Sequence, residues 1–205
     1  MKIAIIGYSG SGKSSLARKL GEIYGIPAMH LDSVHMVGNW EIRGEDESKY
    51  MLKEFMNKPD WIIDGTYKKY YIKERLKQAD YILLLDFNRI DCFIRCLKRY
   101  QQYRGSTRPD LSEGCNEKMD AEFIRWLLYE GRTKRHKNFF LAVKNKYGSK
   151  TIVIKNQCEL DLFIKFNEIQ KRLNEQHNSN NKLRKKNFSR QRNTQRHFRQ
   201  GFRRR

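Results

Sequence analysis

Short apolar runs alternate with longer stretches of helical periodicity along the first 174 residues. Residues 2–6 are apolar and largely β-branched and are followed by a glycine, which is the pattern of a buried parallel strand. Four later runs have the same compact character: 27–31, 61–64, 81–87 and 151–155. The pattern therefore predicts five strands.

The segments between these runs carry apolar residues at helical spacing, as Leu16, Leu20 and Ile23 do in 14–24. Further helices are expected at 48–57, 90–103, 121–147 and 160–173, the third of them bent or broken. Strands that alternate with helices are typical of a parallel sheet with right-handed crossovers and helices on both faces. We expect one three-layer α/β/α domain over residues 1–174.

Two segments lack this periodicity. Residues 104–120 contain two glycines, a proline and two arginines, and are expected to form a loop or a small lid. Residues 175–205 are polar and basic, and too poor in aliphatic side chains to bury a core, so we expect a disordered tail. From 176 onward the tail holds eleven Lys and Arg and no Asp or Glu, whereas the whole chain has a net charge of +20.

The composition narrows the class of protein. The basic charge suits polyanionic ligands such as nucleotides or nucleic acid. The four cysteines form no CxxC pair and have no zinc-ligand spacing, so reduced thiols are expected. No apolar run resembles a secretory signal or reaches the length of a membrane span, which favours the cytoplasm and no membrane partner.

The strongest motif is GYSGSGKS, Gly7–Ser14, which fits G-x-x-x-x-G-K-[ST] between a predicted strand and a predicted helix. Glycines let successive backbone N–H groups point at phosphate oxygens, and the helix N-terminus adds to that field. Lys13 can reach the β- and γ-phosphates, and the Ser14 hydroxyl can bind Mg²⁺. A chance glycine turn is the alternative. We expect a nucleoside triphosphate to contact the residues of this loop: Gly7, Ser9, Gly10, Ser11, Gly12, Lys13, Ser14 and Ser15.

The chain from Met1 to about 174 resembles the adenylate-kinase-like branch of P-loop kinases, and more narrowly the DNA topology modulation protein family. The resemblance rests on MKIAIIGYSGSGKSSLARKLG, HLDSVH, WIIDGTY, the stretch from LLDFNR to RYQQYRGSTRPDLSEGC, EFIRWLLYEGRTKRH and IVIKNQ. It implies a P-loop NTPase fold with strand order 2-3-1-4-5 and ATP as the ligand. The tail lies outside the resemblance.

Two carboxylates end predicted strands, at the edge where open α/β sheets bind ligands. Asp32 follows the second strand, and kinases of the resembled branch have an acidic residue here that holds the acceptor or a Mg²⁺-bound water. A helix N-cap role is the alternative for Asp32. Asp64 precedes Gly65 and is expected to act through Mg²⁺-bound water, or else to be a turn carboxylate. A metal site from Asp32, His30 and His35 has no recognised spacing.

Arginines surround the expected lid. Arg104 and Arg108 bracket Gly105–Thr107, and Arg132 lies in the segment that returns from the lid. Arginines that close over a transferring phosphoryl group stabilise its charge, so we expect these three to be catalytic together with Lys13 and Asp32. A solvated basic helix face is the alternative.

The base of the nucleotide usually lies between the last strand and the next helix in the resembled branch, which points to Asn156. The sequence thus favours a Mg²⁺-dependent kinase acting on a small-molecule or nucleotide acceptor that it does not identify. The alternative is a nucleotide-regulated DNA- or RNA-binding protein, in which the basic tail, with its interleaved phenylalanines, contacts nucleic acid. A solubilising role for the tail is equally open, and the sequence leaves the oligomeric state undetermined.

Overall fold

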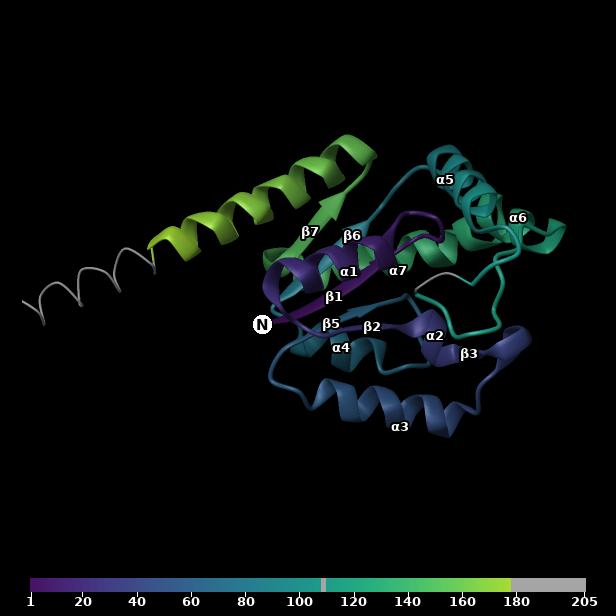
Figure 1. The fold of residues 1–205 in the computed structure, drawn as a ribbon, viewed down its shortest axis with the longest axis horizontal. Helices are drawn as coiled ribbons and strands as arrows, with labels where there is room; N and C mark the ends of the chain where they lie inside the picture. Colours follow the sequence, from purple (N-terminus) through teal and green to yellow (C-terminus); the bar gives the residue numbers. More distant parts are fainter. Residues whose placement is uncertain (108–109, 178–205) are drawn as a thin grey trace, which may run out of the picture. The chain divides into compact units, whose positions relative to one another are not determined.

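A computed structural model describes residues 1–107 and 110–177 of the chain. Its centre is a five-stranded, all-parallel sheet (Figure 1) with the spatial order β2-β5-β1-β6-β7. The strands are β1 (Lys2–Gly7), β2 (Ala28–His30), β5 (Trp61–Asp64), β6 (Tyr81–Leu85) and β7 (Thr151–Ile154). The predicted α/β class and the five parallel strands are confirmed.

The strand order written over all strands differs from the expected 2-3-1-4-5. The sequence analysis missed an antiparallel hairpin, β3 (Met36–Val37) with β4 (Glu41–Ile42), and this hairpin takes the third and fourth places along the chain. Counted among the strands of the five-stranded sheet alone, the spatial order is second, third, first, fourth, fifth. Strands of two residues bury too little apolar surface to show a periodic pattern, which explains the omission.

Seven α-helices lie between the strands of the described residues, together with three short 3₁₀ turns, η1–η3. The helices are α1 (Lys13–Tyr24), α2 (Leu31–His35), α3 (Glu45–Met56), α4 (Ile72–Gln78), α5 (Arg89–Tyr103), α6 (Ala121–Leu128) and α7 (Lys134–Tyr147). The turns are η1 (Gly38–Trp40), η2 (Glu130–Arg132) and η3 (Gly148–Lys150). α1 packs against β1, β2 and β5, α4 against β1, and α7 against β7.

The expected helix over 121–147 is broken at η2, as predicted, whereas α2 and α4 were not foreseen. The second strand is shorter than expected, because Leu31 already begins α2. Asp32 therefore lies in the first turn of a helix instead of directly after a strand.

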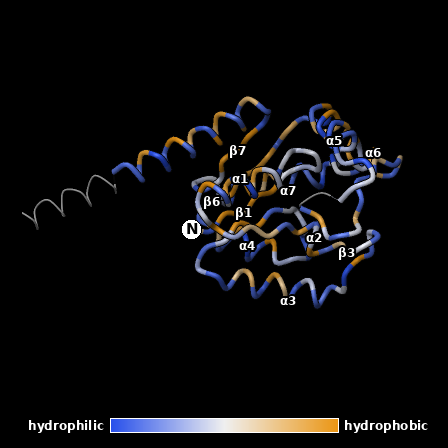
Figure 2. The backbone as a smooth tube through the Cα atoms, in the orientation of Figure 1, coloured by the Kyte–Doolittle hydropathy of each residue, from blue (hydrophilic) through white to orange (hydrophobic). Residues whose placement is uncertain are grey.

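The core lies between the sheet and its helices (Figure 2), where the strands are mostly hydrophobic and the outer helices alternate in hydropathy. Ile5, Ile6, Trp61 and Leu84 of the sheet are completely buried. Burial of side chains of this size contributes roughly 1.5–3 kcal/mol each. The apolar positions of α1 that the sequence singled out, Leu16, Leu20 and Ile23, all join this core.

The chain divides into two compact units, Met1–Ile164 and a second that begins at Lys165. A helix over 157–177 contributes to both, so it extends a few residues beyond the predicted limit of the domain at 174. The tail prediction for 178–205 and the role of Arg108 lie outside the described residues. None of the helices within the described ranges combines the length and the apolar character that crossing a membrane requires.

The sheet makes a strict demand at Gly7, where β1 pairs with Leu85 of β6. A Cβ atom at Gly7 would overlap the Leu85 carbonyl oxygen, and the φ of +148° disfavours L-residues. Gly148 has an ordinary helical conformation and open space around it.

We therefore expect Gly7→Ala to lower the free energy of unfolding by about 2 kcal/mol or more. Gly148→Ala should leave it unchanged or raise it by about 0.5 kcal/mol. Urea denaturation monitored by circular dichroism measures both, and equal stabilities for the two variants would contradict the packing described for Gly7.

Candidate functional site

The loop between β1 and α1 folds tightly around one carbonyl group. Gly10 and Gly12 have φ of +76° and +93°, so the chain turns in a way that favours glycine. The Tyr8 carbonyl oxygen accepts hydrogen bonds from Ser11 N, Ser11 Oγ and Lys13 Nζ, at 3.3, 2.7 and 2.9 Å. Lys13 thus lies at the start of α1 with its ammonium group turned back over the loop.

Neighbouring segments hold this loop from both sides. Thr66 Oγ1 accepts a hydrogen bond from Gly7 N at 3.1 Å and donates one to Gly7 O at 2.9 Å, which ties the end of β1 to the segment after β5. On the side of α5, a Cβ atom at Gly10 would lie 2.6 Å from both the Cys92 carbonyl oxygen and Cys96 Sγ. The buried cysteines of α5 therefore form the floor beneath the loop.

Three side chains cover the loop. Arg95 Nε donates to the Gly10 carbonyl at 3.1 Å. The guanidinium group of Arg132 stacks on the Tyr8 ring, 3.6 Å from its centroid, and its Nη1 donates to the Phe87 carbonyl at 2.6 Å. Trp126 Nε1 donates to Ser9 Oγ at 3.2 Å. Two guanidinium groups and an indole N–H thus contact the loop directly.

The arginines expected to act together are placed differently. Arg132 lies at the loop, as described above. Arg104 is the exposed C-cap of α5, and its backbone bridges to Glu117. Arg99 makes an ion pair with the same buried Glu117, with Nη2 2.7 Å from Oε1. Arg108 lies outside the described residues; of Arg104 and Arg132, the structure brings Arg132 into contact with the loop.

A carboxylate and an imidazole lie in contact at the carboxyl edge of the sheet. Asp64 ends β5 and is 1% exposed, and His30 ends the neighbouring β2, with its Nδ1 2.6 Å from Asp64 Oδ2. Burial alone would lower the pKa of His30, but the hydrogen bond and the charge of Asp64 outweigh it, so the pKa of His30 is raised. Burial also raises the pKa of Asp64, whereas the hydrogen bond and the charge of His30 oppose that rise.

Asp32 adds a second carboxylate to this edge. The Tyr67 hydroxyl donates to Asp32 Oδ1 at 2.9 Å, and both side chains are half-buried. Burial, followed by the charge of Asp32, raises the pKa of Tyr67, so its hydroxyl remains a proton donor. Asp64 is within electrostatic reach of both Asp32 and Lys13. The structure therefore brings together three of the residues that the sequence singled out.

A buried arginine that the sequence analysis missed supports the segment after β5. Arg75 of α4 donates to the carbonyl groups of Gly65, Tyr67 and Tyr70 at 2.9–3.1 Å, and burial lowers its pKa to about 9. Arg75 lies at helical spacing between Ile72 and Leu76, on the buried side of α4. This position in an apolar pattern was the available signal. By fixing these three carbonyl groups, Arg75 positions Thr66 and Tyr67.

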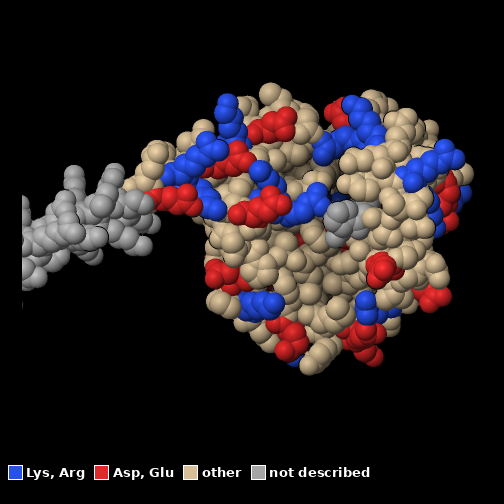
Figure 3. Space-filling view, in the orientation of Figure 1, with Lys and Arg blue, Asp and Glu red and all other residues tan. Residues whose placement is uncertain are grey.

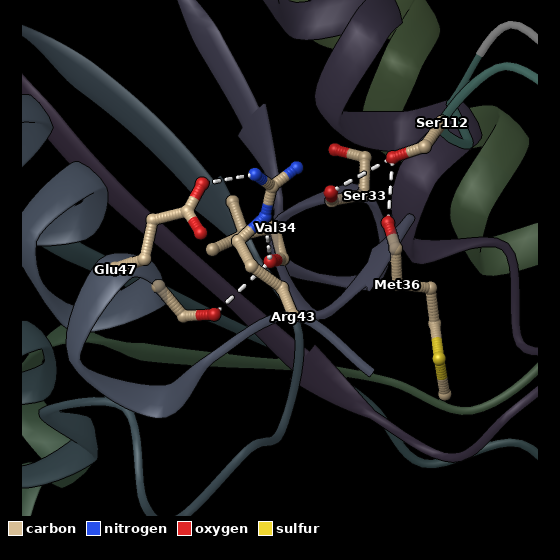
Figure 4. A network of polar contacts seen from close by, with 7 residues as sticks. Ser33, Val34, Met36, Arg43, Glu47 and Ser112 are labelled. Atoms are coloured by element: carbon tan, nitrogen blue, oxygen red, sulfur yellow. Dashed lines mark hydrogen bonds and ion pairs between the residues drawn. The ribbon is translucent and has the colours of Figure 1, made fainter. Parts of the chain in front are cut away.

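The segment that carries Asp32 is held by a polar network (Figure 4). Ser112 Oγ lies 2.9 Å from the Ser33 carbonyl oxygen and 2.6 Å from that of Met36. On the other side, Arg43 Nε donates to the Val34 carbonyl at 3.0 Å and pairs with Glu47. The C-terminal part of the expected lid thus packs directly on α2 and β3, which explains why α2 forms despite its five residues.

The remaining predicted contacts have identifiable places. Ser14 is half-buried and Ser15 exposed in the first turn of α1. Asn156 Oδ1 accepts from Glu159 N at 2.9 Å, and its Nδ2 donates to Glu159 Oε1 at 2.8 Å, so Asn156 caps the helix over 157–177. Within 1–107 and 110–177, no group of three or more His, Cys, Asp or Glu residues is arranged to hold a metal ion.

The charge on the visible face is uneven (Figure 3). Many Lys and Arg side chains lie in the upper part of this view, with acidic side chains among them, and both signs of charge occur in the lower part as well. The first turn of α3 contains Glu45, Asp46 and Glu47.

The His30–Asp64 pair predicts a pH dependence of stability. Because its folded pKa lies above the ordinary 6.5, His30 contributes stability fully below about pH 6.5, and this contribution is lost as the pH rises through the folded value. We expect the difference in unfolding free energy between the wild type and His30→Gln to shrink above that pH. Urea denaturation from pH 5.5 to 8.5 measures this difference. A difference that is constant or grows with pH would show that the pKa of His30 is not raised.

The chain matches no protein-family model, and a search of curated proteins likewise finds no match. What this protein does must therefore be inferred from its own residues and their geometry.

Proposed function

We propose that this protein is a Mg²⁺-dependent phosphotransferase that moves the γ-phosphate of ATP to a small-molecule or nucleotide acceptor. The observation that carries the proposal is the placement of Lys13, Asp32 and Asp64 at the carboxyl ends of the neighbouring strands β1, β2 and β5, beside a glycine loop that opens a helix. An ammonium group for the donor phosphates and carboxylates for the acceptor are the groups that such a transfer needs. A P-loop kinase of the adenylate-kinase-like branch is the family that this arrangement favours.

The donor side follows from the loop. Its backbone N–H groups and the positive end of α1 favour phosphate oxygens, and Lys13 exchanges the Tyr8 carbonyl for the β- and γ-phosphates. Mg²⁺, when bound, neutralises charge on these phosphates. Ser14, at the start of α1, and Asp64, held by His30, are the residues that fit its hydration shell. We assign the base to the segment that begins at Asn156.

The acceptor side follows from Asp32. Its free oxygen accepts the proton of an acceptor hydroxyl while Tyr67 fixes the other oxygen. The acceptor oxygen then forms a bond to the γ-phosphorus, the bond from that phosphorus to the β–γ bridging oxygen breaks, and ADP leaves with the electron pair. Arg132, fixed on Tyr8, stabilises the charge of the transferred group.

The proposed reaction consumes ATP and requires Mg²⁺. We therefore include in the proposal that the protein acts in the cytoplasm. The name of the resembled family, DNA topology modulation protein, does not specify a reaction. The residues at the carboxyl edge of the sheet favour phosphoryl transfer.

Lys13→Ala should abolish phosphoryl transfer and weaken MgATP binding about a hundredfold or more, because it removes the ammonium group proposed to bind the β- and γ-phosphates. The measurement is a ³¹P NMR screen of ATP with pooled metabolites, run beside calorimetry. Arg18→Ala, which removes an exposed cation from the same helix, is the matched control and should behave as the wild type. ATP binding without transfer to any acceptor in a broad panel would contradict the kinase assignment.

Asp32→Asn should lower kcat by about 10²–10⁴ while MgATP binding stays within about twofold, because an amide cannot accept the hydroxyl proton. Tyr67→Phe removes only the hydrogen bond to Asp32 and should give a smaller loss. Equal activity of Asp32→Asn and the wild type would remove Asp32 from the mechanism.

The basic tail favours a second function, nucleic-acid binding. Its eleven Lys and Arg and its three phenylalanines, without Asp or Glu, are suited to phosphates and bases of a single strand. Deleting residues 176–205 should lower the affinity for single-stranded RNA or DNA at least about tenfold at 50 mM salt and reduce its salt dependence. Fluorescence anisotropy measures both. Unchanged affinity in the truncated chain would assign the tail to solubility alone.

A further inference from the structure

Three basic side chains, the exposed Lys68 and Arg135 and the half-buried His136, lie near the glycine loop without taking part in the contacts described above. Lys68 is the residue after Tyr67 in the segment between β5 and α4, whereas Arg135 and His136 lie in the first turn of α7. Lys68 Nζ lies 4.8 Å from the centroid of the Phe139 ring, which places it against the same end of α7. We call Lys68, Arg135 and His136 the basic cluster.

A chain of contacts connects the basic cluster to the loop. The His136 ring meets the Trp126 ring edge-on, with centroids 5.7 Å apart, and Trp126 Nε1 donates to Ser9 Oγ. His136 Nδ1 lies 2.9 Å from Thr133 Oγ1, which fixes the orientation of the imidazole. The Trp126 indole therefore lies between His136 of the cluster and Ser9 of the loop that is expected to bind phosphate.

The charges of the cluster are uncompensated. Burial, followed by Arg135, lowers the pKa of Lys68, and burial, followed by Lys68 and Arg135, lowers the pKa of His136. Across the described ranges, no acidic side chain pairs with any of the three. The first turn of α7, where the helix dipole already disfavours cations, contains no acidic residue either.

Three other cations, on α5, α6 and α7, have a carboxylate partner. Arg99 pairs with Glu117, Arg125 with Glu130, and Lys144 with Asp86, at 2.7, 2.7 and 2.8 Å. A group of cations that repel one another next to a helix N-terminus is stabilised by an anion. The position of the group, beyond the loop and on the side of Tyr67, is where an acceptor would extend.

We propose that the basic cluster binds a phosphate group carried by the acceptor, so that the substrate is a phosphorylated compound. This inference rests on the proposed function, since it assigns the substrate class of the same site. Lys68 and Arg135 donate to the phosphate oxygens, and His136 donates through Nε2 once it is protonated. The neighbouring hydroxyl of the acceptor then faces Asp32.

The test uses inorganic sulfate, which stays dianionic over the whole range, and the ¹H NMR titration of His136 from pH 5 to 8 at constant ionic strength. The signal is assigned with His136→Gln. Sulfate should shift the titration midpoint of His136 to higher pH, because a bound dianion favours the imidazolium. In Lys68→Gln/Arg135→Gln the shift should vanish, and sulfate affinity should fall at least about tenfold. Lys73→Gln/Lys134→Gln removes two exposed charges outside the cluster, one from α4 and one from α7, and should preserve the shift.

Two outcomes would overturn the inference. One is a His136 titration that sulfate leaves unchanged in the wild type. The other is a shift that disappears in Lys13→Ala, since sulfate would then be bound only by the glycine loop. Calorimetry with a non-hydrolysable MgATP analogue separates this result from the proposed function. If the wild-type protein responds to sulfate but binds no nucleotide, the proposed kinase function is contradicted and the anion site is supported. If it binds nucleotide but does not respond to sulfate, the anion site is contradicted and nucleotide binding is supported.

Discussion

Close approach of backbone to backbone at the end of β1 is the constraint on which the site depends. Gly7 lies against the Leu85 carbonyl group, and Gly10 lies against the Cys92 carbonyl group and Cys96 Sγ. No side chain larger than hydrogen fits at either position without displacing β6 or α5. Because these elements belong to the core, the loop is fixed relative to the sheet and Lys13 emerges at one defined place above its edge.

The sheet edge then collects opposite charges. Parallel strands end together, so β2 and β5 bring His30 and Asp64 into contact, and the short helix after β2 brings Asp32 beside them. Buried carboxylates are costly unless they are paired. His30 and Tyr67 provide these partners, while Arg75 stabilises the backbone from which Thr66 and Tyr67 project. Each of the two carboxylates is thus held by a neighbouring side chain.

Much of this fold could be predicted from local patterns. The apolar runs identified five parallel strands, and helical spacing identified the main helices, because each of these segments buries one continuous surface. The hairpin of β3 and β4 and helix α2 could not be found in this way. They are short, and they are held by tertiary contacts such as those of Ser112 and Arg43 with carbonyl groups of 33–36.

The site shows the same division. Lys13, Asp32 and Asp64 were predicted because a motif or a strand end marks them, and the structure places them at one edge. Tyr67, Arg75 and Lys68 were missed, since their roles depend on which segments fold against the residues after β5. Arg104 was grouped with Arg132 from its charge and its place near the lid, but of these two arginines it is Arg132 that contacts the loop.

The central claim is that the loop Gly7–Ser14 binds the phosphates of a nucleoside triphosphate. Amide ¹H–¹⁵N NMR spectra of the full chain during titration with MgATP test it most directly. The account predicts that the largest shifts belong to the amides of residues 9–14, with smaller changes at Thr66 and Trp126. Saturating MgATP or MgGTP that leaves these amides unmoved in the folded protein would contradict it.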